Sequence, residues 1–316
     1  MTGNRLYGPL DDVAGDAGYQ SHPQRVGFFT DTSVCIGCKA CEVACKEWNG
    51  LPDPEGEDLK LTGMSYDNTA QLGADSWRHV AFIEQAVPPK MALSRDSALA
   101  VGDNGELIIA ASAGAVSAGD TDDDGQATRW LMASDVCKHC THAACLDVCP
   151  TGALVRTEFG TVIVQPDVCN GCGYCVSACP FGVIEKREGD GRAWKCTMCY
   201  DRLRGGLEPA CAKACPTDSI QFGPLDELRV TAAARLADLH AAGVTEARLY
   251  GDDPDDGVGG TAAFFLLLDE PAVYGLPPDP VVTTKDLPAM WRWAGLAAGV
   301  LVAGVAVSFA GRAGRA

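Results

Sequence analysis

The sequence predicts an α+β fold built from small cysteine-containing repeats, followed by a single C-terminal transmembrane helix. Three observations predict it. Sixteen cysteines fall into four groups of four. Short runs with strand or hairpin patterning stand beside these groups. Residues 288–310 are almost continuously apolar, over a length that suits a membrane span.

Composition and charge limit the possible functions. The 316 residues are enough for about two ordinary domains. Lys and Arg number 25 against 42 Asp and Glu, which gives a formal net charge of −17. This balance argues against nucleic acid as a partner, because a phosphate-binding surface needs the opposite sign. A hydrophobic fraction of 47% with 21% charged residues is typical of a globular protein and argues against wholesale disorder.

The spacing of the cysteines indicates their chemistry. Groups one and three read C-x2-C-x2-C-x3-C, group two has a middle gap of four residues, and group four has a longer one. The four groups are Cys35, Cys38, Cys41 and Cys45; Cys137, Cys140, Cys145 and Cys149; Cys169, Cys172, Cys175 and Cys179; and Cys196, Cys199, Cys211 and Cys215. Three thiolates within seven residues can hold three corners of an iron–sulfur cube, and the fourth cysteine ligates the other cluster of a pair. Glycines at 37, 171 and 173 suit a loop whose backbone approaches the cluster closely.

Zinc binding and disulfide formation are the two other uses to which cysteines are commonly put. Zinc binding takes two CxxC pairs per ion, which groups two and four alone could supply, whereas groups one and three could not. Disulfides are typical of small secreted scaffolds, and a CxxCxxC run cannot pair efficiently with itself. His139 and His142 could replace cysteine ligands, but every group already has four, so we expect them beside the clusters or at the surface. Iron–sulfur clusters are the best interpretation.

The expected elements follow one another in sequence order. Strands are predicted at residues 26–30, in a hairpin of 98–101 and 106–110 around an Asp-Asn-Gly turn, in a second hairpin of 153–156 and 161–165, in a third of 183–186 and 192–195, and at 219–222. Apolar residues at helical spacing predict a helix over 225–242 that ends at Gly243. The apolar run 263–268 predicts a buried strand before a Pro-rich link.

Several segments carry weaker signals. Residues 1–25 lack both a Sec-type and a twin-arginine pattern, so no signal peptide is expected. Residues 111–128 are expected to form a solvated loop, in which Asp120–Gly125 matches only the first half of an EF-hand. The glycine-rich stretch Gly257–Thr261 lacks the lysine of a P-loop. Because no Ser/His/Asp set and no paired carboxylates stand out, the sequence predicts an electron carrier without catalytic machinery of its own.

The apolar C-terminal stretch reaches 23 residues when it is counted from Pro288 to Ala310. At about 1.5 Å per residue this crosses a hydrocarbon layer of about 30 Å. Trp291 and Trp293 are expected at the membrane interface. Small residues, which include Gly295, Gly299 and Gly304, let another helix pack closely. The alternative is an Ala/Gly-rich helix buried in a globular core.

Beyond these patterns, the residues resemble a known family. Pro180-Phe-Gly182 follows group three, and group four reads Trp194–Arg202 and then Glu208–Thr217. These stretches resemble the electron-transfer subunits of molybdopterin oxidoreductases. Gly257–Thr261 together with Tyr274–Pro278, just before a single C-terminal helix, is similar to the beta subunit of respiratory formate dehydrogenase. The resemblance extends from about residue 26 to the end of the sequence.

The resemblance implies two ferredoxin-like units that hold two [4Fe–4S] clusters each. Carried onto this sequence, cluster 1 takes Cys35, Cys38, Cys41 and Cys215; cluster 2 takes Cys196, Cys199, Cys211 and Cys45; cluster 3 takes Cys137, Cys140, Cys145 and Cys179; and cluster 4 takes Cys169, Cys172, Cys175 and Cys149. The expected organisation is an extension (1–25), unit A (26–60 and 191–224), an insertion with a hairpin (61–130), unit B (131–190), a helix/strand extension (225–287), the transmembrane helix (288–311) and a tail (312–316).

The resemblance also implies partners. A molybdopterin alpha subunit, with molybdenum or tungsten, would oxidise formate, and a haem b gamma subunit in the lipid bilayer would receive the electrons for quinone. The cluster domain would lie outside the cytoplasm, or alternatively on the cytoplasmic face. The other functions considered are the equivalent subunit of a polysulfide, sulfoxide or nitrate reductase, and a zinc-stabilised membrane-tethered interaction protein without redox activity.

Overall fold

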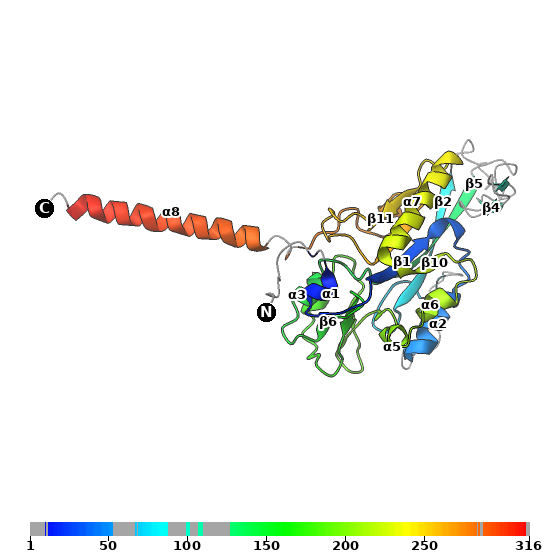
Figure 1. Cartoon of the computed structure of the whole chain (residues 1–316), viewed down its shortest axis with the longest axis horizontal. Coiled ribbons are helices and arrows are strands. Elements are labelled where there is room, and N and C mark those ends of the chain that lie inside the picture. Colours follow the sequence, from blue (N-terminus) through cyan, green and yellow to red (C-terminus); the bar gives the residue numbers. More distant parts are fainter. Residues whose placement is uncertain are drawn as a thin grey trace.

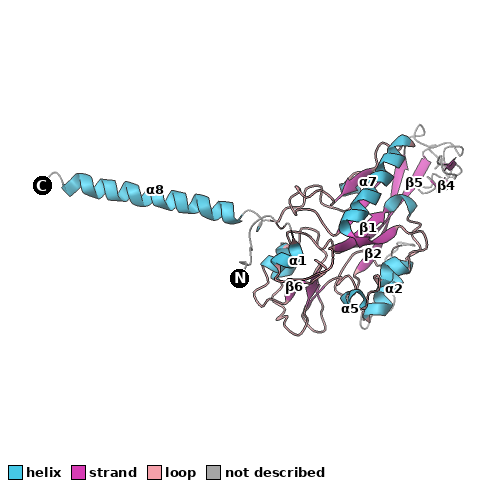
Figure 2. Ribbon diagram, in the orientation of Figure 1, coloured by secondary structure: helices cyan, strands magenta, loops and turns pink. Residues whose placement is uncertain are grey.

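The computed structural model describes residues 10, 12–52, 67, 69–87, 99–101, 107–109, 127–282, 284 and 287–313. These residues form a head, in which all the cysteines lie, and a long helix, α8, that extends away from it (Figure 1). Figure 2 shows that the head mixes short helices, strands and long connections. A mixed α/β head with one apolar C-terminal helix agrees with the expected class.

A four-stranded sheet in the order β10-β1-β12-β11 lies at the centre of the head. Strand β1 (Val26–Asp31) pairs antiparallel with β10 (Ile220–Pro224) and parallel with β12 (Ala263–Leu267), and β12 pairs antiparallel with β11 (Arg248–Tyr250). Both faces of the central strands are covered, which explains why β1 and β12 are continuously buried rather than alternating. These pairings confirm the predicted strands at 26–30, 219–222 and 263–268.

Helix α7 (Leu225–Ala241) lies across this sheet and contacts β1, β10 and β11 (Figure 1). Its buried side chains, Leu225, Leu228, Ala232 and Leu239, recur at helical spacing, which is the pattern that predicted a helix over 225–242. They pack with Phe29 and Phe264 of the sheet in one apolar cluster.

A long two-stranded ribbon, separate from the central sheet, was not predicted. Strand β2 (Arg78–Val87) pairs antiparallel with β5 (Ala127–Val136) over ten residues each. No turn signal announces this pairing, because about forty residues separate the two strands in the sequence. Strand β5 begins at Ala127, so the last two residues of the loop expected at 111–128 are strand instead. It also crosses the boundary expected between the insertion and unit B at residue 130.

Three small hairpins lie outside the central sheet. They pair β3 (Leu99–Val101) with β4 (Leu107–Ile109), β6 (Leu154–Arg156) with β7 (Val162–Val164), and β8 (Glu185–Lys186) with β9 (Ala193–Trp194). All three were predicted, although the third is shorter than expected. The turn at 103–105, the loop at 111–126, the acidic segment Asp120–Gly125 and the first nine residues lie outside the described residues.

Short helices contain or adjoin the cysteines. They are α2 (Ala40–Asn49), α3 (Ala144–Asp147), α4 (Tyr174–Ala178), α5 (Tyr200–Arg204) and α6 (Ala210–Lys213), and a further short helix, α1 (Val13–Asp16), lies before β1. Helix α2 contacts α6, and α3 contacts α4. The fold therefore brings group one to group four and group two to group three.

Helix α8 (Leu287–Ala313) slightly exceeds the stretch expected at 288–311. Its segment Met290–Phe309 has the length and the mean hydropathy, 1.6, of a candidate membrane span. None of this segment is buried, so the alternative of a core helix is wrong. Trp291 and Trp293 are exposed at its beginning. A Cβ atom placed on Gly295, Gly299 or Gly304 meets no heavy atom within 4 Å, so this surface is open along the helix.

Candidate functional site

The four cysteine loops share one backbone feature. The residue before the second cysteine of each group has a positive φ: Gly37 at 65°, His139 at 45°, Gly171 at 70° and Met198 at 56°. This left-handed conformation turns successive backbone N–H groups toward one side, where they form a concave anion site. The glycines adopt it freely, whereas a non-glycine residue there costs about 1–3 kcal/mol. His139 and Met198 thus show that the loop conformation is kept even where it is strained.

The third and fourth cysteines of each group are also placed alike. The third cysteine is the second residue of a short helix in every group, at Cys41, Cys145, Cys175 and Cys211. The fourth follows four residues later, which is about one helical turn. Each of these helices therefore presents one cysteine to its own loop, while the fourth cysteine lies further along, within α2 or just after the end of α3, α4 and α6, where another site can use it.

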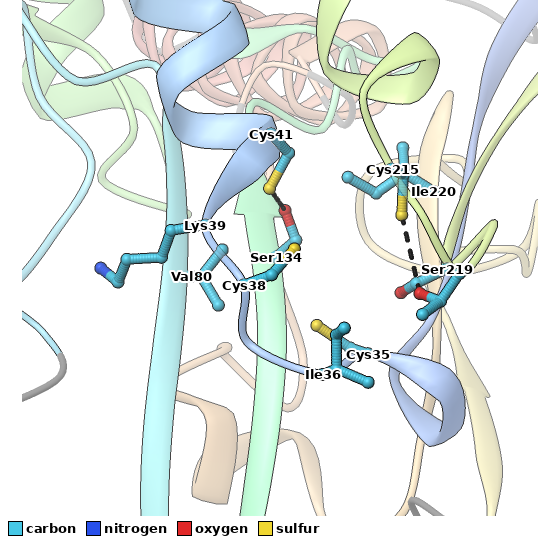
Figure 3. A pocket seen from close by; sticks show the side chains of 11 residues that line it. Cys35, Ile36, Cys38, Lys39, Cys41, Val80, Ser134, Cys215, Ser219 and Ile220 are labelled. Atoms are coloured by element: carbon cyan, nitrogen blue, oxygen red, sulfur yellow. Dashed lines mark hydrogen bonds between the residues drawn. The ribbon is translucent and has the colours of Figure 1, made fainter.

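The first set of thiols, called site 1 here, surrounds a pocket. Cys35, Cys38, Cys41 and Cys215 line it, and three of these thiols turn toward the same space in Figure 3. The Cys41 Sγ lies 3.2 Å from the Ser134 hydroxyl. Burial raises the pKa of Cys41 to about 11. Cys38 is the exposed member of the set.

Site 2 is buried more deeply. The Cys45 thiol interacts with those of Cys196, Cys211 and Cys199, all of them buried. Burial, together with these neighbouring thiols, raises the pKa of Cys45. The Met198 backbone N–H donates to the Cys196 Sγ at 3.2 Å, and the Asn49 amide lies 3.7 Å from the Cys45 Sγ. Donors thus reach the sulfur atoms from a loop and from a helix.

Sites 3 and 4 repeat the arrangement with groups two and three. At site 3 the Cys140 thiol interacts with those of Cys137, Cys145 and Cys179; at site 4 the Cys175 thiol interacts with those of Cys149, Cys169 and Cys172. Burial raises the pKa of Cys145 to about 12 and that of Cys175 to about 11. The Ala193 N–H donates to the Cys169 Sγ at 3.4 Å. Cys172 is exposed, as Cys38 is at site 1.

Electrostatic interactions between thiols of different sets make site 1 a neighbour of site 2, site 2 of site 3 and site 3 of site 4, a succession called the row here. The Cys41 thiol interacts with that of Cys211, which links sites 1 and 2. Cys196 interacts with Cys137, which links sites 2 and 3. Cys145 interacts with Cys175, which links sites 3 and 4. The row begins and ends at the two sites that expose a cysteine.

Two buried cations lie at two of the three junctions of this row, Arg78 between sites 1 and 2 and Lys195 between sites 2 and 3, and sequence reasoning missed both. Arg78 is 2% exposed and donates to the Cys211 Sγ at 3.3 Å. Lys195 is 1% exposed, donates to the carbonyls of Val162 and Cys196, and interacts with the thiols of Cys137 and Cys145. A cation directly before a cysteine was a usable signal for Lys195, whereas nothing local distinguished Arg78.

The donor set fits iron–sulfur clusters. Thiols gather in sets of four, backbone N–H groups donate to sulfur atoms at sites 2 and 4, and buried cations lie beside thiols of sites 1, 2 and 3. These sets suit a group that is anionic and bound by thiolates. In the part of the protein that the structure describes, no three His, Cys, Asp or Glu side chains are arranged to hold a single metal ion.

The two histidines of group two have structural contacts. His139 is buried, and its Nδ1 accepts the Val162 N–H at 3.1 Å. Burial lowers the pKa of His139 well below its usual value, so the ring is neutral. His139 is thus a buried residue beside the cluster loop, which is the first of the two positions expected for it.

The glycine-rich stretch Gly257–Thr261 packs against the same loop. The His142 N–H donates to the Val258 carbonyl at 2.8 Å, and the Thr141 N–H donates to the Gly260 carbonyl at 3.0 Å. A Cβ on Gly259 would lie 2.5 Å from the His142 ring. The glycines of this stretch therefore have a structural role, because they allow close packing beside site 3.

Comparisons with known proteins agree with these features. The sequence matches the 4Fe-4S dicluster domain family over residues 34–153, and a second family of the same description over residues 128–225. It is 36% identical to the nitrate-inducible formate dehydrogenase iron-sulfur subunit of Escherichia coli, over 92% of this chain and 84% of that protein. It is 37% identical to the formate dehydrogenase iron-sulfur subunit of Haemophilus influenzae, over 83% and 72%. The B subunit of the E. coli anaerobic dimethyl sulfoxide reductase is 34% identical over 64% and 75%.

Proposed function

The protein is a member of the family of formate dehydrogenase iron–sulfur subunits, and we propose from this premise that it passes electrons from a formate-oxidising alpha subunit through four [4Fe–4S] clusters to a membrane acceptor. Membership makes it an electron-transfer subunit of a molybdoenzyme complex, without catalysis of its own. The clusters are of the 4Fe–4S kind. Their number, their ligands and the identity of both partners are part of what we propose.

In this proposal each of sites 1 to 4 holds one cluster. Every site takes three cysteines from one group and the fourth cysteine of its partner group, as the resemblance implies. Support comes from the four-thiol sets described above, and most directly from Cys215 in the pocket of Cys35, Cys38 and Cys41. That single observation carries the proposal, because about 180 residues separate Cys215 from the other three.

The protein's own residues hold, orient and shield the clusters. A bound [4Fe–4S] cluster supplies one-electron transfer. The left-handed loops aim N–H groups at sulfur, which stabilises negative charge there. Apolar side chains such as Val80, Leu154 and Val162 are buried in the same core as the cysteines and exclude water. Cys38 and Cys172 are exposed, so the two end sites are the ones accessible to partners.

Metal analysis tests the cluster content. Anaerobically purified protein should contain about sixteen iron atoms and an equal amount of acid-labile sulfide per molecule, because four cubes of four irons fill the four sites. A stoichiometric zinc content with little iron would contradict the proposal and favour the zinc-stabilised interaction protein.

Activity assays test the direction of electron flow. The purified subunit alone should not reduce a dye with formate, whereas a complex that also contains the large subunit should. The competing candidate is the equivalent subunit of a sulfoxide reductase, favoured by the likeness to the dimethyl sulfoxide reductase subunit. A copurified complex that reduces sulfoxides and ignores formate would select this second function.

The membrane acceptor is proposed to be a haem b gamma subunit that passes electrons to quinone. The candidate span Met290–Phe309 supports attachment to the membrane. As the resemblance implies, the head lies outside the cytoplasm, with the C-terminal Arg312 and Arg315 inside. Lys285 precedes the span and Arg292 lies near its beginning, so the charge rule does not decide the orientation. A C-terminal tag that is accessible from outside intact cells would reverse this topology.

A further inference from the structure

We propose that Arg78 is a positioning residue whose buried charge raises the reduction potentials of the clusters at sites 1 and 2. The inference rests on the proposed ligand sets and extends them, since it assigns a role to a residue that is not itself a ligand. It starts from the contacts of one guanidinium group.

Arg78 lies at the junction of the two sites. It is the first residue of β2, and its Nη2 donates to the Cys211 Sγ of site 2 at 3.3 Å. Its Nη1 lies 3.3 Å from the Ser134 hydroxyl and 3.2 Å from the Ser134 carbonyl. The same hydroxyl lies 3.2 Å from the Cys41 Sγ of site 1. One guanidinium thus reaches both sites, directly at site 2 and through Ser134 at site 1.

No carboxylate neutralises this charge within the described residues, because no ion pair involves Arg78. Its Nε, which is buried, has no hydrogen-bond partner there. Two other arginines of the head do have a carboxylate partner: Arg235 pairs with Asp31 at 2.9 Å, and Arg129 pairs with Asp269. Burying an unpaired cation costs several kcal/mol unless a counter-charge lies nearby. The thiols are the groups in a position to supply one.

The group also stays charged. The guanidinium keeps its proton, as arginine does in proteins, and it contacts the Cys211 Sγ directly. The Phe28 ring lies beneath the guanidinium, with the ring centroid 4.8 Å from the Arg78 Cζ, and adds a cation–π contact. Since arginine does not lose its proton in proteins, its effect does not vary with pH in the ordinary range.

A fixed positive charge changes the electron affinity of its neighbours. Reduction adds one negative charge to a cluster, and a cation in a low-dielectric interior stabilises this charge strongly. Hydrogen bonds to the ligating sulfur act in the same direction. Both effects favour the reduced state at sites 1 and 2. Site 4 lies at the far end of the row, so it should feel Arg78 least.

Redox titration of the anaerobically purified holoprotein, followed by electron paramagnetic resonance, tests the inference. In Arg78→Met the equilibrium constant for reduction should fall about tenfold for two of the four clusters, which is a shift of about 59 mV for one electron. Arg78→Lys should restore much of the loss, because it returns the charge. Arg129→Met is the matched control, since it removes an arginine from the same ribbon without a contact to a cysteine, and it should shift no potential.

Each outcome separates this inference from the proposed function. If Arg78→Met keeps its iron and all four potentials are unchanged, the inference is wrong while the proposed function stands. Equal shifts at all four clusters would also overturn it, because they would indicate a general loosening of the head. If the wild type itself lacks iron, the proposed function fails first.

A second variant covers failure of the first to assemble. Arg78→Gln retains a hydrogen-bond donor without the charge, so it should lower the same two potentials if the charge is responsible. Unchanged potentials in Arg78→Gln would contradict the inference, and so would Arg78→Lys potentials that are shifted as far as those of the uncharged variants.

Discussion

The head and helix α8 depart from the rules for water-soluble proteins in opposite directions. The head buries charges: within the described residues, neither Arg78 nor Lys195 has a carboxylate partner. Helix α8 instead exposes apolar side chains along its segment Met290–Phe309, with Val300 72% and Val302 69% exposed. Either feature would be costly if water were the only surrounding medium. The comparison teaches that each region is built for a different non-protein environment, an anionic cluster in one case and lipid in the other.

The two environments stabilise the regions independently. Every cysteine lies before residue 216, whereas the candidate span begins at Met290. Cluster binding contributes to the folding free energy of the head, because the ligands are brought together only in the folded protein. Insertion of α8 depends on its apolar surface and length. Changes in one region should therefore leave the other intact, and the following experiments test this separation.

The largest effect is expected from loss of a ligand in the head. Cys45→Ser should remove the cluster of site 2, lower the iron content by about four atoms per molecule, and destabilise the head by more than about 4 kcal/mol, since losing a metal site is among the most damaging changes. Iron analysis and chemical unfolding measure this. Ala44→Ser, which adds the same hydroxyl at the neighbouring position of α2, is the control and should keep its iron. Loss of the site 1 cluster instead, with site 2 intact, would contradict the crossed ligand sets.

Removal of residues 289–316 should have the next largest effect, and only on location. The truncated protein should move from the membrane pellet to the supernatant with its iron content unchanged, because no cysteine is removed. Sedimentation in detergent-free buffer and iron analysis measure the two properties. A truncated protein that still sediments with membranes would mean that a partner subunit, and not α8, provides the main attachment.

A single charge in the middle of α8 should act in the same way but less strongly. Val302→Arg should cost about 2.5–3.5 kcal/mol of insertion free energy, the penalty for arginine at the centre of a span. The fraction of the protein that resists carbonate extraction should decrease, while the iron content stays constant. Val302→Leu, which keeps the apolar surface, should behave like the wild type. Equal extraction of both variants would contradict a lipid environment for this surface.

The smallest effect is expected from Ser134→Ala. This change removes the hydroxyl that lies between the Cys41 Sγ and Arg78 and should lower the free energy of unfolding by about 0.5–1.5 kcal/mol, as for a typical hydrogen bond. Iron content and membrane attachment should not change. Ser177→Ala, which removes an exposed hydroxyl near site 4, should have a smaller effect still on unfolding. A loss of iron in Ser134→Ala would show that the hydroxyl is needed to assemble site 1.

Much of the organisation could be predicted because its causes are local. The cysteine spacing selects iron–sulfur chemistry, since three thiols within seven residues cannot avoid sharing a site. Gly37 and Gly171 indicated loops whose backbone approaches the cluster closely, and in the structure both have a positive φ. Helix α8 followed from hydropathy and length, and strand β1 from a short apolar run before group one. His139 and Met198 carry the same turn without any glycine to announce it.

Other features required the tertiary structure. The β2–β5 ribbon joins strands about forty residues apart, and no local pattern encodes that register. Arg78 in the sequence resembles any surface arginine, and only the ribbon places it between Cys211 and Ser134. The row of four sites likewise depends on contacts such as that of Cys196 with Cys137. Local spacing therefore determined which chemistry the protein performs, whereas long-range packing decided which charges and which neighbouring sites each cluster position has, because electrostatic interactions depend on distance in space and not on separation along the sequence.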